Sequence, residues 1–111
     1  MTTVSTPVTY VELVLTCASW HEARQIADHL LAHRLIGGAE FFPVAPGSAR
    51  QVAAAAPDGI KLIMESVEHY AELVHQAVAT LRSDRQFVLD LVPVAQLSAT
   101  SQVWAEGIQN E

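Results

Sequence analysis

The chain has 111 residues, the usual length of one domain, and half of them are apolar, which is enough for one sizeable core. Twelve acidic residues against six basic ones give a net charge of −6. Nucleic acids and anionic membranes select clusters of Lys and Arg, so neither is expected as a partner. The single cysteine cannot form an internal disulfide, so no oxidising compartment is implied. No apolar stretch is long enough to span a membrane and residues 1–7 lack a secretory signal, so a cytoplasmic location is expected.

The first half of the chain predicts a loose tail at 1–7, then a strand, a helix and a second strand. Residues 8–18 are rich in β-branched side chains, which is typical of a strand. Ser19 and Glu22 fit a capping box, in which the two residues satisfy free N–H groups at a helix start. The pair Gly37-Gly38 predicts the helix end, because glycine tolerates the left-handed position there. Residues 39–44 follow as a short edge strand. The apolar residues of the helix recur at helical spacing: Ala23, Ile26, Ala27, Leu30, Leu31 and Leu35.

The second half begins with residues 45–59, which are rich in alanine, proline and glycine and predict a hairpin arm or flexible loop. Residues 60–65 alternate as a strand, and Ser66 is expected to cap a helix that runs to residue 81. A fourth strand at 86–94 and a short terminal helix at 98–108 complete one domain, 1–111. Strand-helix-strand repeated twice predicts an α+β, ferredoxin-like β-α-β-β-α-β sandwich with a short C-terminal helix.

Both helices of such a fold cover one face of the sheet, yet the strands carry apolar side chains on both faces. Leu13 and Leu15 alternate with Val14, for example. An exposed apolar sheet is uncommon on a monomer, so we expect other copies of the chain to bury the second face. Four charged residues share the parity of that face: Glu12, Lys61, Glu65 and Asp90. They predict either a polar network at the subunit interface, with Lys61 as its cation, or simple exposure near the strand ends.

Three stretches of the sequence together resemble the CutA family of divalent-ion tolerance proteins, which are small trimeric relatives of the PII proteins. They are LVLTCASWHEARQIADHLLAHRLIGG, IKLIMESVEHYAELVHQAVATL, and the terminal helix with Val103-Trp104. The resemblance implies a homotrimer. The chain has Ile36-Gly-Gly-Ala-Glu40 where members usually carry Ala-Ala-Cys-Val-Asn, and Ser83-Asp84-Arg85-Gln86 where they carry a His-Pro-Tyr-Glu-type motif. We therefore expect a divergent member to which the family's ligand residues mostly do not transfer.

Two groups of residues are candidates for ligand binding. His29 and His33 lie four apart on the first helix, with Glu22 on nearly the same side, and could hold copper or zinc. The alternatives are a polar shoulder of the helix or a subunit contact. In the arm, the residues best suited to bind an anion are Gly47, Ser48, Arg50 and Gln51, which offer backbone N–H groups and one guanidinium. Cys17 has the parity of the core and is expected to be an inert thiol.

The function expected from these features is that of a non-enzymatic, trimeric CutA/PII-like binding or signalling protein linked to divalent metal ion tolerance. Its ligand, a metal ion or a small anion, would lie in clefts between subunits beside the 45–59 arm. The alternative is a structural trimer that displays this arm to a protein partner. An enzyme is disfavoured, because no acid–base or nucleophile pair can be assembled from the sequence.

Overall fold

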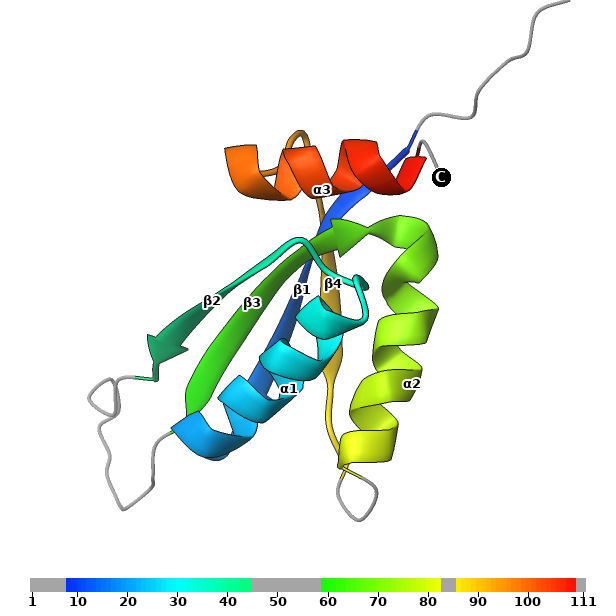
Figure 1. The fold of residues 1–111 in the computed structure, drawn as a ribbon. Helices are drawn as coiled ribbons and strands as arrows, with labels where there is room; N and C mark the ends of the chain where they lie inside the picture. Colours follow the sequence, from blue (N-terminus) through cyan, green and yellow to red (C-terminus); the bar gives the residue numbers. More distant parts are fainter. Residues whose placement is uncertain (1–7, 45–58, 83–85, 110–111) are drawn as a thin grey trace, which may run out of the picture.

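The computed structural model describes residues 8–44, 59–82 and 86–109, and their helices and strands follow the predicted order (Figure 1). The elements are β1 (Tyr10–Cys17), α1 (Trp20–Ala32), β2 (Gly38–Pro43), β3 (Ile60–Val67), the 3-10 turn η3 (Glu68–Tyr70), α2 (Ala71–Leu81), β4 (Leu89–Val94) and α3 (Ala99–Gln109).

The four strands form one antiparallel sheet in the order β2-β3-β1-β4. Leu13 in the middle of β1 pairs with Met64 of β3 on one side and with Leu91 of β4 on the other. Strands β1 and β2 therefore run in the same direction with β3 between them, which is the split arrangement of a ferredoxin-like sheet. The predicted α+β fold is confirmed. Pro43 lies on β2, an edge strand, where the missing N–H costs no ladder hydrogen bond.

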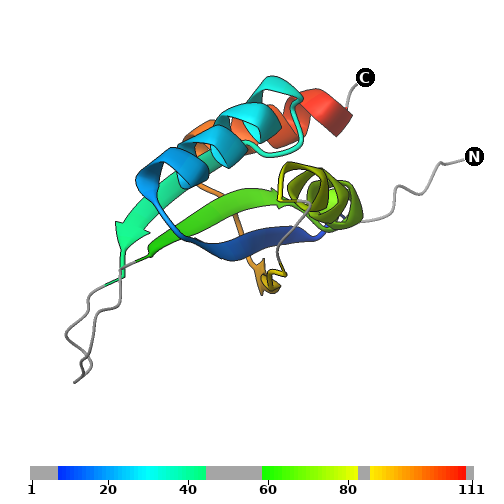
Figure 2. The ribbon, with the colours of Figure 1, turned by 90° about the horizontal axis from the view of Figure 1, so that it is seen from below.

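Helices α1 and α2 cover the same face of the sheet, and the main core lies between them and the strands (Figure 2). Alternate residues of the two central strands point into this core and are almost completely buried, as the period of two in a strand requires. They are Val11, Leu13, Leu15 and Cys17 from β1 and Ile60, Leu62 and Met64 from β3. The stripe predicted for α1 meets them through Ala23, Ile26, Ala27 and Leu30.

The end of α1 differs from the prediction. The helix stops at Ala32, and the left-handed residue after it is Arg34, with φ of 60°, whereas no described glycine has positive φ. The N–H of Leu35 donates to the carbonyl of Leu30, and the N–H of Arg34 donates to that of Leu31. These two bonds form a Schellman motif, so the helix is closed without a glycine.

Gly37 and Gly38 are needed instead for close packing of α3. A Cβ at Gly37 would lie 2.6 Å from Cε3 of Trp104 and 3.0 Å from the Cα of Ser101. A Cβ at Gly38 would lie 2.7 Å from the hydroxyl oxygen of Ser101. The double glycine thus admits α3 to the end of the sheet.

Replacing Gly37 with alanine is expected to destabilise the protein by about 1–3 kcal/mol, because the methyl group overlaps a tryptophan ring and a helix backbone that are both held in place. Gly107→Ala is the matched control. Gly107 is a residue of α3, but a Cβ there would meet its nearest atom, Nη2 of Arg34, only at 3.8 Å. Since Gly107 is in a helix, that control should gain about 0.5–1 kcal/mol. Urea unfolding followed by circular dichroism measures both changes, and equal effects would contradict the packing role of Gly37.

Ser66 does not begin the second helix. Strand β3 continues to Val67, and the fully buried Ser66 hydroxyl donates to the carbonyl of Leu35 at 2.8 Å. The 3-10 turn η3 then leads into α2, which has no side-chain cap. The serine links β3 to the segment after α1.

Helix α3 lies across one end of the sheet, where a second, smaller core forms (Figure 1). Val67, Leu97 and Ala105 are buried in it. Trp104 packs edge-on against Tyr70, and its indole N–H donates to the carbonyl of Arg34 at 3.1 Å. This end of the sheet is therefore covered by the chain itself.

Candidate functional sites

The two histidines near the end of α1 lie side by side. The ring centres of His29 and His33 are 4.3 Å apart, with an angle of 41° between the planes. His29 is half-buried and His33 is exposed. The structure thus brings together the two imidazoles that the i, i+4 spacing predicted.

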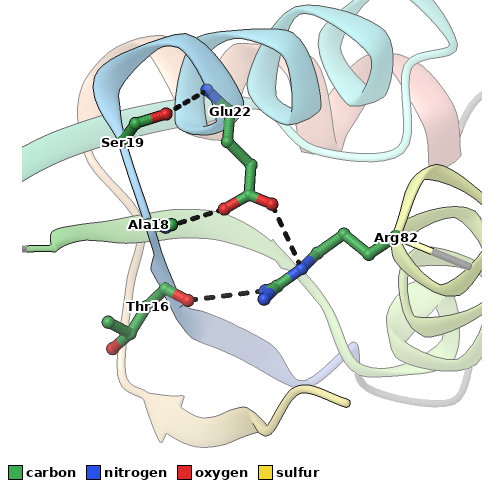
Figure 3. A network of polar contacts seen from close by, with 5 residues as sticks. All are labelled: Thr16, Ala18, Ser19, Glu22 and Arg82. Atoms are coloured by element: carbon green, nitrogen blue, oxygen red, sulfur yellow. Dashed lines mark hydrogen bonds and ion pairs between the residues drawn. The ribbon is translucent and has the colours of Figure 1, made fainter. Parts of the chain in front are cut away.

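Glu22, the third predicted metal ligand, is used elsewhere (Figure 3). Its backbone N–H donates to the Ser19 hydroxyl at 3.2 Å, which confirms Ser19 as the cap. Its Oε1 accepts from the N–H of Ala18 at 2.7 Å, one residue before the N–H that a capping box uses. Its Oε2 lies 3.4 Å from Nε of Arg82. Glu22 precedes His29 by seven residues, which is a rise of about 10 Å along the helix. In the described parts of the chain, His, Cys, Asp and Glu nowhere gather in a group of three that could hold a metal. The predicted three-ligand set is therefore corrected to a histidine pair.

Arg82, at the end of α2, joins three elements, a role that no local sequence pattern predicts (Figure 3). Its side chain is only 8 % exposed, and Nη1 donates to the carbonyl of Thr16 at 3.4 Å. The guanidinium also lies over the ring of Phe87, 5.7 Å from its centre. The Nε–H makes no hydrogen bond of good geometry, so its attraction to Glu22 is mainly that of the two charges. Arg82 therefore ties the ends of β1 and α2 to the start of α1.

Cys17 lies on the core side of β1 and is 1 % exposed, as predicted. Burial raises the pKa of its thiol to about 11, and the charge of Glu22 adds to the increase, while Arg82 opposes it. A thiol that is both covered and protonated is a poor nucleophile and a poor metal ligand.

Glu65 has a role that its alternating position along the strand did not reveal. Its Oε1 accepts hydrogen bonds from the hydroxyls of Ser98, at 2.7 Å, and Ser101, at 2.6 Å. Its Oε2 accepts from the backbone N–H of Ser98 at 3.1 Å. Burial raises the pKa of Glu65, but the hydrogen bonds from the two serines outweigh it, so the pKa lies below its usual value. The carboxylate anchors the start of α3 within its own chain.

The other three charges of the predicted network lie on the sheet face away from α1 and α2. Glu12 is in direct register with Glu65, Lys61 with Thr16, and Asp90 with Val14. Lys61 and Asp90 are exposed, and within residues 8–44, 59–82 and 86–109 no carboxylate forms an ion pair with Lys61. Their pairing across subunits stays a prediction.

The candidate anion ligands Gly47, Ser48, Arg50 and Gln51 lie outside the described residues. Within the described residues, an aromatic group that sequence reasoning missed joins α1 to β2. Trp20, which is half exposed, lies 5.5 Å from the ring centre of Phe41, and Arg24 lies over the same ring. Only the alternation of β2 could have suggested that Phe41 faces α1.

No protein-family model matches the sequence, and no curated protein is similar to it. Solved structures do match. CutA1 from Oryza sativa superimposes with a TM-score of 0.73 over 93 % of this chain and 95 % of its own, at 12 % identity. The chain has the CutA fold. Two further proteins with this fold match with a TM-score of 0.71. The periplasmic divalent cation tolerance protein CutA from Archaeoglobus fulgidus is 18 % identical, with 88 % of this chain and 96 % of that one covered. CutA from Synechococcus elongatus, solved in complex with a Bis-Tris molecule, is 14 % identical, with 88 % and 91 % covered.

The CutA fold agrees with the resemblance found in the sequence. Among the described residues, every helix is too short or too polar to cross a bilayer.

Proposed function

We propose that this chain is a divergent CutA protein, a non-enzymatic, cytoplasmic binding or signalling protein that works as a homotrimer. Its ligand, a metal ion or a small anion, binds in clefts between the subunits. The role in divalent ion tolerance is suggested by the names of the proteins that share its fold. Those proteins are at most 18 % identical, so the similarity itself supports the fold and the function is our inference.

The observation that carries the proposal is the sheet face that α1 and α2 leave uncovered. Val14 and Ile63 lie opposite each other in the centre of this face and are half-buried. Val92 of β4, two residues from Asp90, is 44 % exposed, and Phe42 of β2 is equally so. Apolar side chains on a central β-layer are stabilised when other apolar surface covers them. Copies of the same chain can bury this face, where Glu12 lies opposite Val92 and Asp90 lies opposite Val14, so these carboxylates need partners in the assembly.

The mass of the assembly tests this proposal. At micromolar concentration, light scattering after size exclusion should give three times the mass of one chain. Val92→Asp places a charge in the face and is expected to reduce the mass to that of one chain, because burying an unpaired carboxylate costs several kcal/mol. Val103→Asp is the control, since this α3 residue is 70 % exposed and lies elsewhere. A wild-type mass of one chain would overturn the trimer, and so would an unchanged mass in Val92→Asp.

A further inference from the structure

We propose that His29 and His33 form a two-nitrogen site for a divalent transition-metal ion, and that the site binds Cu²⁺ most tightly. The proposal goes beyond the binding function proposed above, because it adds a metal site that lies on one helix and not in a cleft between subunits. It does not depend on the trimer, because both ligands come from one helix of one chain.

The geometry of the pair suits chelation. With metal–nitrogen bonds of about 2.0–2.1 Å and an angle of about 90–110° between them, two coordinating imidazole rings have centres roughly 4.5–5 Å apart. The ring centres of His29 and His33 are 4.3 Å apart, which is close to that separation. Residues four apart lie on the same face of a helix, one turn from each other.

The ring nitrogens are available. Within the described parts of the chain, neither ring takes part in a hydrogen bond or an ion pair, and each contacts the other ring. Since His33 is exposed and His29 is only half-buried, a metal ion can reach the pair from solvent and keep water on its remaining positions.

The local charge also favours a cation. His33 is the C-cap of α1 and His29 lies in its last turn, where the helix dipole is negative. Two charged residues are next to the pair in the sequence. Asp28 precedes His29 and carries a negative charge, whereas Arg34 follows His33 and extends its guanidinium to α3 at Gly107. The net charge of −6 raises the concentration of cations around the whole molecule.

The other described histidines do not form such a pair. His69 packs on Tyr70 and His75 packs on Phe87, and the two are six residues apart around η3 and α2. His21 lies in the first turn of α1, two turns or more from His29. Imidazole ligands follow the order in which Cu²⁺ binds more tightly than Ni²⁺ or Zn²⁺, whereas Mg²⁺ prefers oxygen. The pair therefore predicts selection of Cu²⁺ and Zn²⁺ against Mg²⁺.

Titration calorimetry on the tag-free chain in a buffer that does not bind metals tests the site with Cu²⁺, Zn²⁺ and Mg²⁺. We expect one Cu²⁺ per chain, weaker Zn²⁺ binding and no Mg²⁺ binding. His29→Gln and His33→Gln should each weaken Cu²⁺ binding about tenfold or more, because the second nitrogen acts at high effective concentration. Electron paramagnetic resonance should show coupling to two imidazole nitrogens in the wild type and to one in each variant.

The matched control is the double variant His69→Gln/His75→Gln, which removes the same number of imidazoles from elsewhere and should leave Cu²⁺ binding unchanged. Copper binding that survives in His29→Gln/His33→Gln, or no binding by the wild type, would overturn the site. Light scattering on the same samples separates the two proposals. Loss of copper binding at an unchanged trimer mass supports the site, whereas a single-chain mass with copper binding intact overturns only the trimer.

Discussion

Replacing Glu22 with alanine is expected to destabilise the fold by about 3–5 kcal/mol, because it leaves the charge of Arg82 buried without its partner. The two side chains are 8 % and 18 % exposed, so water replaces the lost carboxylate poorly. The same change removes the acceptor of the Ala18 N–H at the start of α1. Urea unfolding at pH 7, followed by circular dichroism, measures the loss.

Arg82→Met is the informative counterpart. It removes the buried charge itself and keeps an unbranched side chain to pack near Phe87. In this variant Glu22 still accepts the hydrogen bond from the Ala18 N–H, and its side chain is partly exposed to water. The expected loss of unfolding free energy is therefore smaller, below about 2 kcal/mol. The asymmetry is the prediction: a loss below about 1 kcal/mol in Glu22→Ala would mean that the ion pair does not hold the three elements together.

Glu65→Ala is expected to cost about 3 kcal/mol and to loosen α3. It removes the acceptor of three hydrogen bonds, two from Ser98 and one from Ser101, whose side chain is fully buried and would be left without that partner. Protection of the α3 amides from hydrogen exchange should fall more than that of α1. Equal protection in both helices would contradict the anchoring role.

The same carboxylate predicts a pH dependence with a definite sign. The pKa of Glu65 is lower in the folded chain than its ordinary value of 4.5, because the hydrogen bonds favour the ionised form. Its contribution to stability is therefore complete above pH 4.5 and is lost as the pH falls through the lower, folded pKa. Glu65→Gln keeps the shape but does not titrate. The difference in unfolding free energy between wild type and Glu65→Gln should shrink below pH 4.5, and a constant difference would contradict the assignment.

Local patterns in the sequence were sufficient for the order of the elements and for the faces of the strands. The alternation in β1 placed Leu13 and Leu15 in the core, and the spacing of Ser19 and Glu22 located the start of α1. Such patterns depend on neighbouring residues only. The errors came where a residue is used by a distant part of the chain: Ser66 bonds to Leu35, 31 residues away, and so remains in a strand instead of capping a helix.

The candidate sites divide in the same way. The histidine pair could be predicted because its geometry is set within one helical turn. Glu22 shares the side of that helix, but its partner Arg82 comes from α2, and no local pattern shows that the carboxylate is already used. Glu65 had the correct parity, yet Ser98 and Ser101 follow it by 33 and 36 residues. Only the folded chain decides between a free charge and one that is hydrogen-bonded.

The central position of β1 also affects how the chain folds. It emerges first during synthesis, but its two neighbours in the sheet lie far along the chain: Leu15 pairs with Leu62 and with Leu89. Contacts of such large sequence separation form slowly. During synthesis, one edge of β1 therefore stays without its partner until β3 has been made, and the other edge stays open until β4 follows. Open strand edges favour aggregation, so this is the stage at which we expect a chaperone to help most.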